Sequence, residues 1–192
     1  MGQLTIQQSF DQAVQHHQAG RLPEAEQLYR KILAREPKHA PSMHLLGMIA
    51  NQKKQYDVAA DLIRQSIALS PNVAEAHNDL GIALKNAERF DEAIAVFRQA
   101  IALKPDFADA HSNLGVVLTA KGRRDEAITA FRLAIVLRPN YAEAHNNLGN
   151  VLKDQGQLDE AIVAFRQAAA LIPNYAEAYS NLGDALRITG LT

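Results

Sequence analysis

Histidine and carboxylate side chains recur along the chain at positions where they could bind a metal ion or transfer protons. The histidines are 34 residues apart, and so are the acidic residues: His77, His111 and His145, and Glu75, Asp109, Glu143 and Glu177. Zinc ligands must lie about 2 Å from the metal, whereas equivalent positions on neighbouring helices are separated by about 10 Å, one helix width. One such residue per repeat therefore indicates packing and capping roles. We expect no metal site, no cofactor site and no catalytic constellation.

Amide side chains form a second periodic row. Asn113, Asn147 and Asn181 each precede a Leu-Gly pair, and Asp79 holds the same position. Because an amide both donates and accepts hydrogen bonds, such a row could bind the backbone of an extended peptide whatever its sequence. The same predicted surface includes adjacent positions and positions one turn later: Asn78, Ser112 and Asn146, then Ile82, Val116 and Asn150. The alternative interpretation is a solvated polar surface, copied as the repeats duplicated.

Proline and glycine show which elements position these rows, because both recur without interruption every 34 residues. The prolines are Pro37, Pro71, Pro105, Pro139 and Pro173, and the glycines are Gly47, Gly81, Gly115, Gly149 and Gly183. A fixed period of this length indicates one supersecondary unit that buries its apolar face by stacking on its copies. The sequence predicts one array over residues 1–192, with repeats at 6–39, 40–73, 74–107, 108–141 and 142–175 and an extra helix at 176–190.

Each repeat contains two stretches with apolar residues at helical spacing, joined by a short polar connection. Such a connection favours an antiparallel helix pair, so we expect an all-α solenoid. The pairs Asn72 with Glu75 and Asn140 with Glu143 resemble capping boxes at the start of the first helix. Gly81 and its equivalents, facing Ala93 and its equivalents, should allow close helix approach. Phe97 and its equivalents should fill the wider space between consecutive pairs.

Composition limits the functions to consider. The chain has 20 basic and 21 acidic residues, a formal net charge of −1 and no cysteine. Without a basic face, nucleic acid and anionic membrane surfaces are unlikely partners. Disulfides and thiolate chemistry are excluded, and no apolar run approaches the roughly 20 residues that span a bilayer. The opening residues lack the pattern of a secretory signal. We therefore expect a cytoplasmic location.

The chain resembles the tetratricopeptide repeat family, whose 34-residue motif has a small residue after leucine, then alanine, an aromatic residue and a closing proline. Residues 108–141 fill that pattern with Leu114-Gly115, Ala127, Phe131 and Pro139, while residues 6–39 diverge most. The resemblance implies a right-handed superhelix whose first helices line a concave, ligand-binding surface. It also implies that the histidines occupy the family's large packing position. The asparagine row is similar to the repeats of O-linked N-acetylglucosamine transferases.

The resulting functional prediction is a non-enzymatic scaffold that binds an extended or helical peptide in its concave groove. Acidic residues at the early groove positions exclude the basic clamp of chaperone-binding relatives. One alternative is a substrate-recognition fragment of a larger enzyme, such as a glycosyltransferase of the resembled type. Another is a structural array that forms homo-oligomers through its last helix, where Leu182 and Leu186 are positioned to pack against a second helix. The bland reading is that this helix simply caps the fifth repeat.

Overall fold

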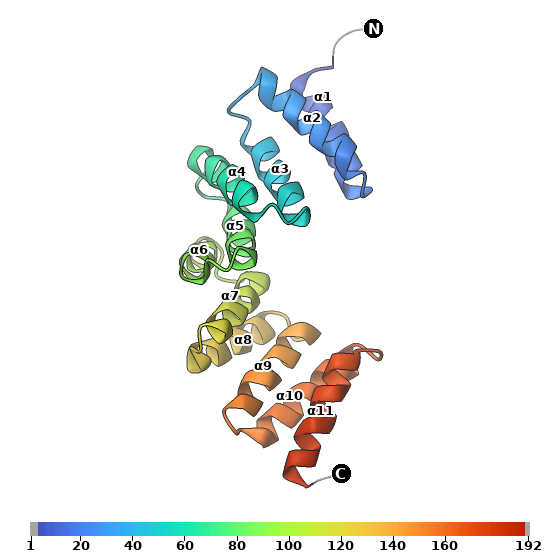
Figure 1. Ribbon diagram of the computed structural model, residues 1–192, viewed down its shortest axis with the longest axis vertical. Coiled ribbons are helices and arrows are strands. Elements are labelled where there is room, and N and C mark those ends of the chain that lie inside the picture. The colour runs from blue at the N-terminus through green and yellow to red at the C-terminus, as the bar shows by residue number, and fades with distance from the viewer. Residues whose placement is uncertain (1–3, 191–192) are drawn as a thin grey trace. The chain divides into compact units, whose positions relative to one another are not determined.

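The computed structural model describes residues 4–190, which form eleven α-helices joined by short turns (Figure 1). The helices are α1 (Ile6–Gln18), α2 (Leu22–Arg35), α3 (Ala40–Gln52), α4 (Tyr56–Leu69), α5 (Ala74–Asn86), α6 (Phe90–Leu103), α7 (Ala108–Ala120), α8 (Arg124–Leu137), α9 (Ala142–Asp154), α10 (Leu158–Leu171) and α11 (Ala176–Thr189). They succeed one another as antiparallel pairs, which confirms the all-α prediction. No helix within this described part is long and apolar enough to cross a bilayer.

Contacts divide the chain into two compact units, one ending at Glu92 and the other beginning at Ala93. The first unit contains α1 to α5 and the start of α6, and the second contains the rest of α6 and α7 to α11. Within each unit, a helix packs both against its pair partner and against the following repeat. The single array over residues 1–192 stays a prediction.

The periodic glycines bring the two helices of a pair into close contact, as predicted. A Cβ atom on Gly115 would lie 2.7 Å from Cε1 of Phe131, and one on Gly149 would lie 2.6 Å from Cε1 of Phe165. The expected neighbour was wrong, however. The phenylalanine ring covers the glycine of its own repeat, so the ring fills the inside of the pair and not only the space between pairs.

The predicted capping boxes at the first helices are wrong. The N-cap residues of α5, α7, α9 and α11 are Val73, Phe107, Tyr141 and Tyr175, and none accepts a side-chain hydrogen bond. Each Asn or Asp lies one residue earlier, where its backbone closes the turn. The carbonyl of Asn140, for example, accepts the N–H of Ala142 at 3.2 Å. A complete capping box occurs at α1, between Thr5 and Gln8.

The turn inside each pair has a periodicity of its own. Residues with positive φ occur 34 residues apart at Gly20, Lys54, Glu88, Gly122 and Gly156. A left-handed residue reverses the chain between the two helices, and glycine adopts this conformation without steric cost. Lys54 and Glu88 reach the same conformation, at φ values of 60° and 59°, despite their side chains.

The last helix, α11, packs against α10 through small residues. Ala178 and Ala185 are fully buried, and Ala178 joins a cluster with Ala168 and Ala169. Leu182 and Leu186 are half-buried, so they are less exposed than a helix without packing would leave them. Tyr179 is 50% exposed. The helix thus caps the fifth repeat on one side and keeps an accessible apolar side.

Gly115→Ala should destabilise the second unit by about 1–3 kcal/mol, because the added methyl group must displace a buried ring. Gly183→Ala is the matched control, since nothing lies within 4 Å of a Cβ atom there. That change removes a helical glycine and should stabilise the protein by up to about 1 kcal/mol. Urea unfolding followed by circular dichroism measures both effects. Equal effects of the two substitutions would contradict the close-contact role.

Candidate functional site

The predicted groove residues lie on the first helices α5, α7, α9 and α11, but they differ in exposure. The residues of the asparagine row and those one turn later are partly exposed: Asp79, Asn113, Asn147, Asn181, Ile82, Val116 and Asn150. The adjacent row is buried, with 6% of Asn78, 4% of Ser112 and none of Asn146 exposed. Burial removes these three residues from any surface that a peptide could reach. The accessible candidate face is therefore narrower than the sequence predicted.

Asn146 belongs to a contact between repeats. Its Nδ2 donates to Oε1 of Glu177 at 2.9 Å, and its Oδ1 accepts from Nδ2 of Asn181 at 3.1 Å. Both partners come from α11, so one buried amide joins α9 to the following first helix. Because a buried amide must satisfy both its donor and its acceptor, this arrangement gives Asn146 a structural role.

An equivalent contact joins α3 to α5 in the first unit. Nε2 of His44 lies 2.8 Å from Oδ2 of Asp79, and both side chains are mostly buried. Nearby, Nδ2 of Asn86 donates to Oδ1 of Asn51 at 3.0 Å. These pairs, like Asn146 with Asn181, are 35 residues apart, one more than the repeat. Sequence comparison at a spacing of 34 missed them, whereas polar pairs at a spacing of 35 were a readable signal.

The histidine row closes the turns that precede the first helices. Nε2 of His77, His111 and His145 lies 2.8, 2.9 and 2.9 Å from the carbonyl oxygen of Pro71, Pro105 and Pro139, respectively. Each imidazole N–H can therefore satisfy a carbonyl that the interrupted helix leaves without a helical donor. This geometry supports the predicted structural role. Residues 4–190 contain no group of three or more His, Cys, Asp or Glu side chains that could hold a metal ion.

In the acidic row, Asp109 forms an ion pair with Arg138 instead of capping its helix. The guanidinium donates to both carboxylate oxygens at 2.8 Å and lies over the ring of Tyr141, 4.6 Å from its centroid. These hydrogen bonds are the main cause of the lowered pKa of Asp109. The pair therefore fixes the end of α8 against the start of α7.

The accessible face is hollowed in both units, with different linings. In the first unit, a hollow of about 120 Å³ is lined by Met48, Asn51, Gln52, Ile63, Asp79 and Ile82. In the second unit, an open hollow of about 580 Å³ between α9 and α11 is lined by Lys153, Asp154, Asp184, Arg187 and Ile188. The lining is thus mainly apolar in the first case and charged in the second.

Comparison with known families decides the classification. Profiles described as tetratricopeptide repeats match residues 10–74, 78–142 and 130–163, and one described as a TPR repeat matches residues 149–187. The chain belongs to the tetratricopeptide repeat family. Proteins of this family mediate protein–protein interactions, and their repeat fold is typically a non-catalytic scaffold. No curated protein matches the chain significantly.

Solved structures of other tetratricopeptide repeat proteins are similar to this one. MamA is 27% identical with a TM-score of 0.77, over 86% of this chain and 96% of its own. YrrB, described as a TPR protein with an unusual peptide-binding site, is 21% identical with a TM-score of 0.74, over 90% and 89%. PilF of Pseudomonas aeruginosa is 18% identical with a TM-score of 0.86, over 97% and 85%. The last two show the fold alone, and these comparisons do not show the expected likeness to glycosyltransferase repeats.

Asn146→Ala should destabilise the second unit by about 1–3 kcal/mol, because Glu177 and Asn181 lose their buried partner. Asn147→Ala changes the adjacent, partly exposed amide and should alter stability by less than about 0.5 kcal/mol. Urea unfolding distinguishes the two. If Asn146→Ala is as harmless as its neighbour, the buried amide does not hold the repeats together.

Asp109 should make stability depend on pH in the acid range. A carboxyl group whose folded-state pKa is lowered stabilises the fold above its unfolded pKa, and this contribution disappears as the pH falls through the folded pKa. Asp109→Asn should therefore cost up to about 1 kcal/mol at neutral pH, a modest value because the pair is partly exposed. The difference from wild type should vanish near about pH 2. Urea titrations at both pH values test this, and a constant difference would contradict it.

Proposed function

We propose that this protein is a scaffold that binds a partner polypeptide on the accessible face of its first helices. The observation that carries the proposal is the pair Asn147 and Asn150, two partly exposed amides three residues apart on α9. Residues at this spacing lie on the same side of a helix. Together they offer donors and acceptors that fit the backbone of an extended peptide.

The residues around this pair support binding without rearrangement. Asn146 lies directly before Asn147 and is held by α11, while Gly149 lies against the ring of Phe165. The exposed amides therefore stand on a helix that is fixed from both sides. A fixed surface binds a peptide with less loss of conformational entropy than a mobile one.

The apolar positions of the face suggest what else the ligand contains. Met48 and Ile82 line the hollow in the first unit, and Val116 is partly exposed on α7 in the second. A peptide that adds apolar side chains to its backbone contacts would bury them against these residues. The proposed ligand is therefore an extended polypeptide with apolar side chains, and not a strongly charged segment.

Two alternatives from the sequence have narrower support. Presentation of substrates to a glycosyltransferase-like domain depends on a free amide row, but Asp79 and Asn181 are engaged in contacts between repeats. Self-association through α11 is favoured by Tyr179, which is half exposed, and by the open surface at Gly183. Sedimentation over a range of protein concentrations tests self-association, and a monomer throughout would contradict it.

Peptides selected from a random library on the immobilised protein provide the probe for the groove. Asn147→Ala together with Asn150→Ala should weaken their binding about fivefold or more, since each lost hydrogen bond is worth about 0.5–1.5 kcal/mol. Fluorescence anisotropy measures the affinity, and circular dichroism checks that the fold is unchanged. The matched control is Gln167→Ala, which removes an exposed amide from a second helix. Selected peptides that ignore the asparagines but respond to Gln167 would overturn the proposal.

A further inference from the structure

The second unit has an apolar surface that the proposed peptide groove does not use. It lies on the outer sides of the second helices, where the largest apolar exposure belongs to Val136 at 74%, Val163 at 57% and Leu133 at 45%. Val136 and Leu133 are on α8, and Val163 is on α10. Apolar residues that gather on one face in this way often mark a site of interaction.

Two hollows in this surface flank α8 in equivalent positions. The larger has a volume of about 530 Å³ and lies between α8 and α10, and the smaller has about 390 Å³ and lies between α6 and α8. The first helix beneath each hollow supplies equivalent floor residues: His145, Leu148 and Leu152 of α9, and His111, Leu114 and Leu118 of α7. The repeat therefore builds the same apolar hollow twice, one on either side of α8.

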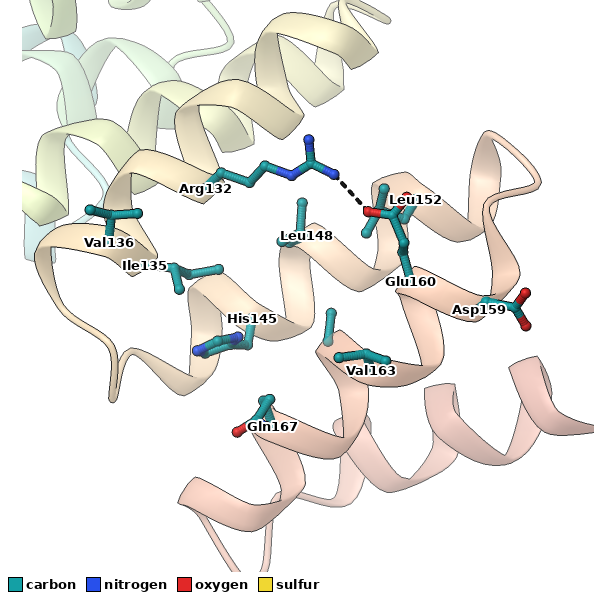
Figure 2. A pocket seen from close by; sticks show the side chains of 11 residues that line it. Arg132, Ile135, Val136, His145, Leu148, Leu152, Asp159, Glu160, Val163 and Gln167 are labelled. Carbon is teal, nitrogen blue, oxygen red and sulfur yellow. Dashed lines mark hydrogen bonds and ion pairs between the residues drawn. The ribbon is translucent and has the colours of Figure 1, made fainter.

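Figure 2 shows how the larger hollow is bounded. Arg132 extends from α8 toward Glu160 of α10, and their side chains meet at 2.7 Å above Leu148 and Leu152. Val136 and Val163 face the space from opposite walls. The smaller hollow is bounded in the same way by Arg98 and Glu126, which meet at 3.0 Å. An ion pair between two second helices thus sets the width of each hollow.

The charges at the two rims differ. In the larger hollow, Arg132 is paired with Glu160, and Asp159 adds a second carboxylate to the lining. In the smaller hollow, Arg123 also binds Glu126, at 2.7 Å, so an additional cation balances the carboxylates. The corresponding position at the larger hollow is the neutral Gln157. The larger hollow therefore keeps an excess of negative charge, which favours a ligand with a basic group there.

We propose that this outer surface binds an amphipathic helix of a partner protein, laid across α8 with one apolar side chain in each hollow. A helix is about 10 Å wide, and seven residues of a partner helix rise about 10 Å and return to nearly the same side. Two apolar residues seven apart can therefore reach both hollows at once. A lysine or arginine beside the residue that enters the larger hollow faces Asp159.

The test uses a fluorescent alanine–lysine peptide of about 15 residues, the length at which an isolated helix becomes marginally stable. It carries two leucines seven residues apart. In a control peptide of the same composition the leucines are five apart, which places them on different sides of the helix. We expect the first peptide to bind at least fivefold more tightly by fluorescence anisotropy. Equal affinities, or no binding by either peptide at about 1 mM protein, would overturn the proposal.

Variants of the protein locate the site. Val136→Lys and Val163→Lys should each weaken binding at least fivefold, while Val58→Lys changes an equally exposed valine in the first unit and should have no effect. Because these side chains are exposed, the melting temperature should stay unchanged and exclude unfolding as the cause. Asp159→Lys should weaken binding of the lysine peptide through charge repulsion. An equal loss in Val58→Lys would show that the hollows are not the site.

Two further outcomes would also overturn the proposal. The first is binding to vesicles of phosphatidylcholine and phosphatidylglycerol, lost in Val136→Lys, without binding of the peptide. It would make the apolar surface a membrane contact. The second is a concentration-dependent dimer that Val136→Lys abolishes, seen by sedimentation, which would make the surface a contact between copies of the chain.

Discussion

The contact between a glycine on the first helix and a large side chain on the second sets the spacing on which the rest of each repeat depends. Gly115 and Gly149 each accept a phenylalanine ring where any larger residue would collide with it. The residues on either side of this contact inherit their positions from it. Asn147, two residues before Gly149, is partly exposed on the proposed peptide-binding face. Leu148, the residue between them, forms the floor of the outer hollow. One steric constraint thus positions both candidate binding surfaces.

Polar contacts complement this apolar packing by fixing each repeat to the next. Apolar side chains are compatible with small displacements along a helix, because dispersion has little directional preference. Hydrogen bonds to a buried amide do not tolerate such displacement, since a lost partner leaves a desolvated polar group. Asn146 satisfies this requirement between α9 and α11, and the pair of His44 with Asp79 satisfies it between α3 and α5. Packing therefore brings the helices together, and these contacts select their register.

Much of the architecture could be read from the 34-residue period, because proline, glycine and phenylalanine act through local steric effects that recur in every repeat. The capping boxes failed because the turn before α9 uses the backbone of Asn140, and sequence spacing does not distinguish a side-chain from a backbone acceptor. The groove was drawn too wide because burial of Asn146 depends on the following repeat. The outer hollows went unnoticed because their walls come from residues 28 apart, such as Arg132 and Glu160. Contacts at spacings other than the period need three-dimensional information.

The polar contacts between first helices also mean that the repeats are not interchangeable. Asn146 needs a carboxylate from Glu177 and a donor from Asn181 in the helix that follows it. If residues 74–107 followed directly after residues 142–175, Asp79 would stand where Asn181 donates, and one acceptor would face another. A shuffled chain could keep every apolar contact and still be penalised at this junction. The sequence therefore encodes the order of its repeats, although their outlines are nearly identical.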